Sequence, residues 1–340
     1  MGNNISDYIN YYVSHIFDDG YIKEINEINC HKFPNNFFMP KKLDTGEILH
    51  VVRFSGLNDL YEYLTSDPVI NEKVFKYMQS LNNDSSFAGK SYDDAVSDLI
   101  SNSYNPGYQE FLKLQNSLEN CINMPIHRYN KVMTVAGGHL NVPAYSAGAP
   151  LCYETEERRM APKFIHIDVT ISYMHSTTKE QVFNRAIIIT NILKALENAG
   201  YRIDLNTFFL SNIGKEYLHL IFKVKNYSEL LNMQTLYKIL CQVEFLRRVL
   251  FRVIETTGMY SSRWGRNYGD CLTEDEVKQI LNYGKNDIYF DEPINMGIAG
   301  NDLADDFETA INHIQIADKL DVEYAKRKFR EQVKRLNLSK

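Results

Sequence analysis

The sequence predicts an α/β protein with a Rossmann-like, three-layer core, preceded by an N-terminal region of mixed helices and strands. The first supporting observation is a strand–helix–glycine–strand unit between Lys163 and Leu210, where a strand-like pattern gives way to a helical one and then returns. The second is a composition of 44% apolar and 24% charged residues in 340 positions, which is enough for a sizeable core. Parallel strands need a long crossover, usually a helix, so this unit predicts a parallel pair covered by helices.

The central unit has clear start and stop signals. Thr177 or Thr178 can cap its helix, and Gln181 lies three residues after Thr178, as in a capping box. Gly200 suits the left-handed residue that follows a helix. The expected elements are strand Lys163–Tyr173, helix Lys179–Asn198 and strand Tyr201–Leu210.

Apolar spacing predicts further elements on both sides of this unit. Residues 1–50 are expected to be an irregular lead-in, with a short amphipathic helix over 5–16 and a loop from Pro34 to Pro40. The other expected strands are Leu49–Phe54, Lys131–Val135, Glu216–Val224 and Asp287–Glu292. The other expected helices are Asn58–Leu64, Asp93–Ile100, Tyr108–Asn120, Leu236–Glu255 and Asp305–Leu320.

We expect three regions along the chain: an α+β region over 1–150, the Rossmann-like core over 151–322 and a basic helical tail over 323–340. The tail carries two carboxylates, Glu323 and Glu331, against seven cations. Such a segment is usually a solvated helix, although it could dock on nucleic acid or an acidic partner. The cations are Lys326, Arg327, Lys328, Arg330, Lys334, Arg335 and Lys340.

The sequence favours a cytoplasmic protein. The first 19 residues lack the basic flank and apolar run of a signal peptide, and no apolar stretch is long enough to cross a bilayer. The five cysteines are widely spaced and odd in number, so no disulfide framework is expected. The net charge of −6 argues against coating nucleic acid with the whole surface, but it allows a local basic patch.

Five short motifs occur in order along the chain: Phe54-Ser-Gly56, Phe87-Ala-Gly89-Lys-Ser-Tyr92, Val135-Ala-Gly137 with Asn141-Val-Pro143, Leu196-Glu-Asn-Ala-Gly200, and Phe245-Leu-Arg247-Arg248. Together they resemble a large family of uncharacterised proteins encoded mainly by bacteriophages and prophages. The resemblance spans roughly residues 50 to 300. It implies a phage-encoded protein that acts in the host cytoplasm or belongs to the virion, and it supplies no catalytic residues.

The segment from Asp168 to Leu210 also looks like the opening of a von Willebrand A-type domain. In that family an Asp-x-Ser-x-Ser stretch after the first strand holds a divalent cation, and Asp168, Thr170 and Ser172 occupy the matching positions. The resemblance therefore implies a Mg²⁺ site, because a carboxylate with two hydroxyls offers the oxygen ligands that Mg²⁺ prefers. The alternative is that these residues form the polar face of a continuing strand, since Ile171 stands where the family has glycine.

A group of arginines and one tryptophan forms a second candidate site. Three arginines lie on the expected helix Leu236–Glu255, and two more flank the tryptophan in the segment that follows. Arginines beside an aromatic ring suit contact with single-stranded nucleic acid, but also ion pairing within the protein or a contact with another protein. The residues are Arg247, Arg248, Arg252, Arg263, Trp264 and Arg266.

No catalytic signature is present. His139 and His175 lie in loops where a ligand could bind, but neither belongs to a recognisable motif. Gly89-Lys90-Ser91 ends like a phosphate-binding loop, yet Asp84 stands where the first glycine is required. Cys152 and Cys271 have no base at a readable spacing. We therefore expect no enzyme and no tightly held cofactor.

The sequence thus favours a non-enzymatic protein-binding or assembly protein that contacts a protein partner or another copy of itself, with no membrane association. Two alternatives stay open: nucleic-acid binding through the Arg247–Arg266 region and the basic tail, and a Mg²⁺-dependent binding site at Asp168.

Overall fold

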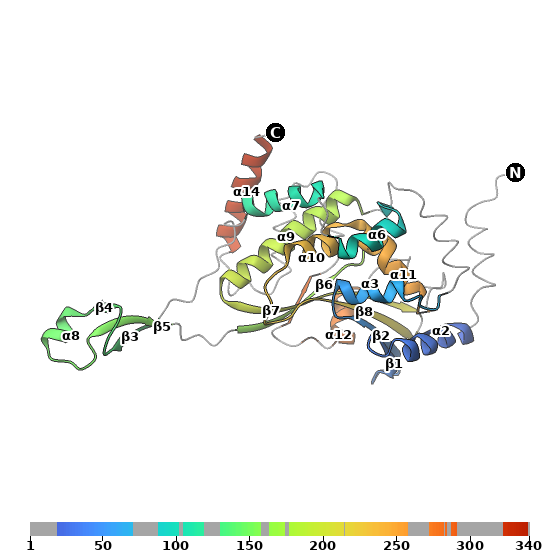
Figure 1. The fold of residues 1–340 in the computed structure, drawn as a ribbon, viewed down its shortest axis with the longest axis horizontal. Helices are drawn as coiled ribbons and strands as arrows, with labels where there is room; N and C mark the ends of the chain where they lie inside the picture. Colours follow the sequence, from blue (N-terminus) through green and yellow to red (C-terminus); the bar gives the residue numbers. More distant parts are fainter. Residues whose placement is uncertain are drawn as a thin grey trace.

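The computed structural model has at its centre a six-stranded mixed sheet in the order β1-β2-β8-β7-β6-β9 (Figure 1). Three of its five adjacent pairs are parallel, namely β2 with β8, β7 with β6, and β6 with β9. The strands are β1 (Phe37–Lys42), β2 (Ile48–Phe54), β6 (Lys163–Thr170), β7 (Tyr201–Ile213), β8 (Glu216–Lys225) and β9 (Asp287–Phe290). The structure describes residues 19–70, 88–101, 105–118, 130–157, 163–173, 177–213, 215–257, 272–281, 283, 287–290 and 322–338.

The predicted β-α-β unit is confirmed. β6 and β7 are parallel neighbours, in register from Lys163 opposite Tyr201 to Thr170 opposite Phe208. Helix α9 (Lys179–Asn198) connects them and begins with the expected capping box between Thr178 and Gln181. Gly200 has φ of 91°, in the left-handed region that glycine tolerates best.

The region before residue 150 contributes two strands to this same sheet. β2 lies parallel to β8, with Ile48 opposite Glu216, and so adds to the sheet on the side away from β6. The loop predicted for Pro34–Pro40 is wrong in its second half, which belongs to edge strand β1. Pro40 is compatible with an edge strand because its missing N–H can face away from the ladder. Phe37 is almost fully buried, and this burial gives β1 its anchor on the sheet.

The described helices are α2 (Asp19–Lys32), α3 (Leu57–Thr65), α6 (Tyr92–Ile100), α7 (Pro106–Leu118), α8 (Val142–Ser146), α9, α10 (Met233–Leu236), α11 (Phe251–Glu255), α12 (Glu274–Leu281) and α14 (Val322–Leu338), with the π-helical turns η1 (Tyr237–Cys241) and η2 (Phe245–Leu250). The single helix predicted for Leu236–Glu255 is wrong, because extended backbone at Gln242 separates η1 from η2. The Tyr173 hydroxyl donates to the carbonyl of Val243 next to the break. Apolar spacing continues across this break and therefore cannot reveal it.

The two faces of the sheet differ in character. Ile165, Ile167 and Val169 of β6 point into the main apolar core, which also contains α9 and both π-helical turns. The alternate residues of β6 point to the opposite face, where α12 covers a smaller apolar cluster around Phe208 and Tyr289. We call this the second face.

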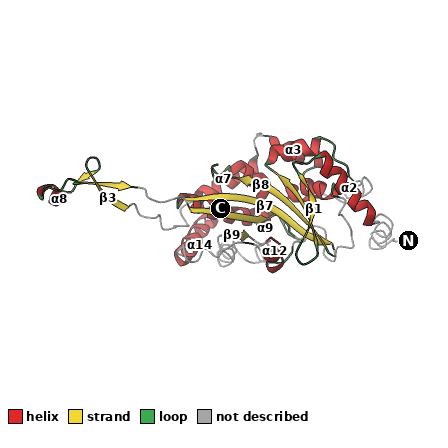
Figure 2. Cartoon of the chain, turned by 90° about the horizontal axis from the view of Figure 1, so that it is seen from below, coloured by secondary structure: helices red, strands yellow, loops and turns green. Residues whose placement is uncertain are grey.

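A small three-stranded sheet, in the order β3-β5-β4, forms a separate unit. It comprises β3 (Asn130–Thr134), β4 (His139–Leu140), α8 and β5 (Tyr153–Glu157), and we call it the arm. Both views show the arm set apart from the six-stranded sheet (Figures 1 and 2). The strand predicted at Lys131–Val135 is confirmed as β3, whereas β4, α8 and β5 were not predicted from the sequence.

Among the described helices, none is both long and apolar enough to span a membrane. The helices predicted over 5–16 and 305–320 lie outside the described residues. The basic tail is helical as predicted, since α14 covers most of it.

Candidate functional site

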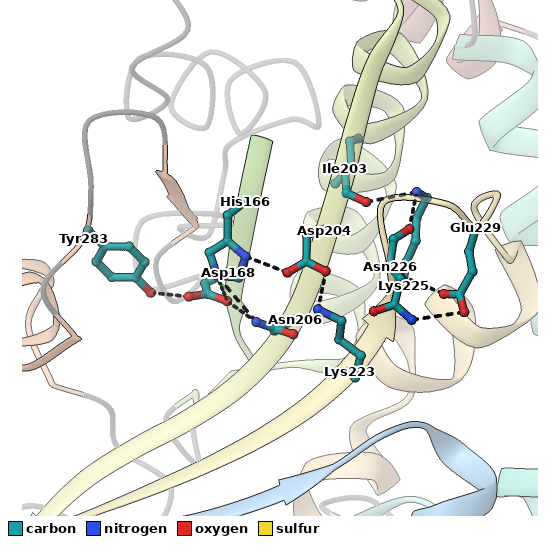
Figure 3. Close-up of polar contacts among 10 residues, drawn as sticks. All are labelled: His166, Asp168, Ile203, Asp204, Asn206, Lys223, Lys225, Asn226, Glu229 and Tyr283. Atoms are coloured by element: carbon teal, nitrogen blue, oxygen red, sulfur yellow. Dashed lines mark hydrogen bonds and ion pairs between the residues drawn. The ribbon is translucent and has the colours of Figure 1, made fainter. Parts of the chain in front are cut away.

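A row of polar side chains crosses the second face from β6 to β8 (Figure 3). His166 and Asp168 come from β6, and the cross-strand register places Asp204 opposite His166 and Asn206 opposite Asp168. Lys223 of β8 forms an ion pair with Asp204 and extends the row to a third strand. Because strand side chains alternate between faces, these residues share a face through their even spacing on β6 and β7.

His166 bridges two carboxylates. Its Nδ1 lies 3.0 Å from Oδ2 of Asp204, and its Nε2 lies 3.1 Å from Oδ1 of Asp168. Burial lowers the pKa of His166, but the two carboxylates outweigh it and raise the pKa above the ordinary 6.5. An imidazolium can donate through both nitrogens, so this geometry favours the charged form of the ring.

Asp168 accepts hydrogen bonds at both of its carboxylate oxygens. Asn206 donates to its Oδ1 at 3.0 Å, and the Tyr283 hydroxyl donates to its Oδ2 at 2.8 Å. Burial raises the pKa of Asp168, yet the bonds from His166, Tyr283 and Asn206 outweigh burial and lower it. The carboxylate is therefore ionised and satisfied by protein groups.

Asp168 and Thr170 of the predicted Mg²⁺ site are engaged by protein groups. Asp168, Thr170 and Ser172 are all buried and lie at alternate positions along β6 and its continuation, as the polar-strand alternative expects. The Thr170 hydroxyl accepts from the Ser172 amide at 3.3 Å, and Asp168 is occupied by His166. Among the described residues, the Ser172 hydroxyl has no hydrogen-bond partner, and no group of three His, Cys, Asp or Glu side chains is placed to hold a metal. The Mg²⁺ site stays a prediction, which thermal melts of the protein and of Asp168→Ala with and without Mg²⁺ would test.

The same close-up shows Lys225, the last residue of β8, whose role is structural. Lys225 is almost fully buried, and its ammonium donates to the carbonyls of Ile203 and Asn226, both at 3.0 Å. Its third contact is Glu197 in the last turn of α9, at 3.1 Å. Lys225 thus ties α9 to the sheet.

The three described arginines of the second candidate site point into the protein rather than away from it. Arg247 is buried, donates to the Thr177 carbonyl at 2.8 Å and lies over the ring of Tyr173. Arg248 donates to the carbonyl of Lys90 at 2.9 Å. Two of the sequence motifs therefore meet in space, because the loop at Gly89 packs against η2. A role for Arg247 and Arg248 in binding nucleic acid or a partner stays a prediction.

Glycine at position 89 suits this close contact. Its φ is 75°, and a Cβ at this position would overlap the side chain of Glu244. The resemblance to a phosphate-binding loop at Gly89-Lys90-Ser91 therefore has a structural explanation. Ser91 caps α6 by accepting from the amide of Asp94, and Lys90 pairs with Asp98.

Arg252 takes part in a buried cluster with Tyr92 and Glu255. Its guanidinium lies over the Tyr92 ring at 5.9 Å and 3.9 Å from Oε2 of Glu255. Glu255 is 3% exposed, and burial raises its pKa to about 8, against a smaller opposing effect of Arg252. A carboxyl group that is largely protonated at neutral pH in the middle of the fold was not foreseen from the sequence.

The remaining candidates are dispersed. His139 is exposed on β4 of the arm, and Cys152, next to β5, is buried. His175, Arg263, Trp264, Arg266 and Cys271 lie outside the described residues. Of the two described candidates, neither His139 nor Cys152 belongs to the row on the second face.

Among the residues that the structure describes, the arm carries the largest group of exposed apolar side chains. Val142 and Tyr145 of α8 are 61% and 62% exposed, although α8 is held firmly by polar contacts. Asn141 caps α8 by accepting from the Ala144 amide and donates to Glu154 of β5 at 2.6 Å. Other exposed apolar residues of the arm are Val135, Leu140 and Leu151. Sequence reasoning missed this surface because it predicted neither a helix nor a strand between Val135 and Lys163.

The comparisons with known proteins give a family but no activity. Residues 44–320 match the model of a family described as "Domain of unknown function (DUF7192)", and the chain therefore belongs to that family. Neither the curated proteins nor the solved structures contain a match to the chain. The match spans the six-stranded sheet from β2 to β9 as well as the arm, and it ends before α14.

Proposed function

We propose that this chain is a non-enzymatic protein-binding or assembly protein that contacts its partner through the arm. The observation that carries the proposal is the exposure of the arm's apolar side chains. Contiguous apolar surface on a soluble protein commonly marks a site of interaction. Val142 and Tyr145 are three residues apart on α8 and so lie on one side of that helix, and Leu140 of the adjoining β4 is also exposed.

The arm has little apolar interior of its own. Of the arm residues whose burial the structure describes, only Cys152 is buried, and β4 has two residues. Small sheets of this kind gain stability by packing an apolar face on something else. Polar contacts instead fix the arm's shape, among them the bond between the hydroxyls of Thr134 and Thr155 at 3.1 Å. A surface with a fixed shape and outward apolar groups loses little entropy on docking, which favours binding.

The experiment compares a double variant of the arm with a control of matched chemistry. Val142→Ser with Tyr145→Ser removes the two large exposed apolar side chains of α8. Leu230→Ser removes an apolar side chain that is 81% exposed on the main body. Light scattering after size exclusion and chemical crosslinking in cells measure self-association and capture of another protein.

We expect the wild-type chain and Leu230→Ser to associate equally and the double variant to lose association. Association through a second copy would show as a doubled mass of the purified protein. Association with another protein would show as a crosslinked band whose intensity depends on Val142 and Tyr145. A wild-type chain that is monomeric and forms no crosslink would refute the proposal.

The von Willebrand A-like core and the phage origin, which the sequence predicts, belong to the same proposal. The order β8-β7-β6-β9, with a crossover between β6 and β7 and an antiparallel β7–β8 pair, supports a von Willebrand A-like core. The motifs shared with phage proteins support a phage-encoded chain that acts in the host cytoplasm or the virion. A non-enzymatic role accords with a row on the second face in which His166 and Asp168 already satisfy each other.

A further inference from the structure

Helix α14 has two chemically distinct sides. Ala325 and Phe329 are fully buried, and α14 contacts α7, beside which it lies in Figure 1. With 100° of rotation per residue, Arg327 and Lys334 project from the side opposite these two residues. Both are exposed. The apolar stripe therefore fixes the helix on the protein and turns the cationic side to solvent.

The charge of α14 differs in sign from that of the chain. The helix contains six Lys and Arg against Glu323 and Glu331, a net charge of +4. The whole chain carries −6, so the rest of it carries −10. Within the helix, Lys328 pairs with Glu331 at 3.0 Å, whereas Arg327 and Lys334 lie on the line that faces solvent. Positive charge is therefore concentrated on α14, whereas the rest of the chain is acidic.

We propose that this cationic side of α14 binds the phosphate backbone of a nucleic acid. Arg327 and Lys334 are separated by about 10 Å along the helix axis, a span comparable to three phosphates of one strand. Arg335 is also exposed and adds a third cation near the same end of the helix. Guanidinium groups bind phosphate oxygens in a bidentate manner, and lysine adds a compact charge.

The chemistry of this side favours nucleic acid over other acidic partners. Protein interfaces rely on buried aromatic or aliphatic anchors, and between Arg327 and Lys334 the exposed side of α14 carries no large apolar residue. Helices that bind anionic membranes insert an apolar face, but the apolar residues Ala325 and Phe329 of α14 are packed inside the protein. Contact with phosphates needs only charge and hydrogen-bond donors.

The test measures fluorescence anisotropy of labelled 20-nucleotide single strands and 20-base-pair duplexes with the full chain at several salt concentrations. Arg327→Gln with Lys334→Gln removes two cations from α14. Lys41→Gln with Lys42→Gln removes two exposed cations from β1 and serves as the control with equal charge loss. Arg327→Lys alone keeps the charge. Circular dichroism and melting confirm that each variant is folded.

We expect the wild-type chain to bind at 50 mM salt, with affinity that falls as salt rises. The α14 double variant should bind about tenfold or more weakly, with the slope of log affinity against log salt reduced by about 2. The β1 control should bind like the wild type, and Arg327→Lys, which keeps the charge, should lose less affinity than the α14 double variant. The proposal is overturned by a wild-type chain that binds neither oligonucleotide at low salt, or by equal losses in both double variants. Binding to phosphatidylserine vesicles without binding to either oligonucleotide would also overturn it.

Discussion

The raised pKa of Glu255 predicts how the stability of this protein depends on pH. The carboxyl group is buried in the fold, and its pKa rises from the ordinary 4.5 to about 8. An acid with a raised pKa in the folded state binds protons more tightly there than in the unfolded chain. The folded state therefore loses stability as pH rises from 4.5 to 8 and regains it as pH falls through that window.

The magnitude follows from the shift. Each unit of pKa is worth about 1.4 kcal/mol, so keeping Glu255 buried costs about 1 kcal/mol at pH 5, about 3 at pH 7 and nearly 5 above pH 8. Glu255→Gln keeps the shape of the side chain and removes its titration. The variant should thus gain about 4 kcal/mol relative to the wild type between pH 5 and pH 8.5.

Urea unfolding of the two proteins at pH 5, 7 and 8.5 measures this difference. Glu110→Gln, at an exposed position of α7, is the matched control and should follow the wild type at every pH. If the free energies of unfolding of Glu255→Gln and the wild type change in parallel with pH, the reasoning about Glu255 is wrong.

Two further predictions concern other parts of the fold. Gly89→Ala should destabilise the protein by about 2–3 kcal/mol, because it places a Cβ at positive φ and against Glu244. Gly148 also has a positive φ, of 70°, but has open space around it. Gly148→Ala should therefore cost only about 1 kcal/mol. Equal losses in thermal melts of the two variants would show that the contact with Glu244 is unimportant. The raised pKa of His166 means that its ion pairs stabilise the fold below pH 6.5 and that this contribution is lost as pH rises through the folded-state value. His166→Gln should therefore lower the melting temperature more at pH 5.5 than at pH 8.5, and the opposite order would contradict the assignment of an imidazolium.

The part of the fold that sequence could predict is the part governed by local signals. Thr178, Gln181 and Gly200 mark the ends of α9 through backbone hydrogen bonding within a few residues, and the structure places them there. The start of α3 shows the limit of such signals. Asn58 is a good capping residue, yet the helix begins at Leu57 after Gly56, without a side-chain cap.

Features set by contacts between distant segments could not be predicted in the same way. The pairing of β2 with β8 depends on residues 168 positions apart, Ile48 and Glu216. The bridge from His166 to Asp204 depends on the register of two strands, which the strand patterns alone do not determine. The sequence could place Asp168 on a strand, but it could not show that His166, Asn206 and Tyr283 surround it.

The pairing of β2 with β8 has a consequence for how the chain reaches its native state. During synthesis β2 emerges long before β8, so β2 can pair only with β1 while the intervening segment is being made. Pairings between remote segments also slow folding, because a large loop must close before any contact forms. Fragments that begin after residue 55 would lack β2 and leave one edge of β8 unpaired. An unpaired strand edge promotes aggregation. Dissection of this protein into smaller soluble pieces should therefore retain β2.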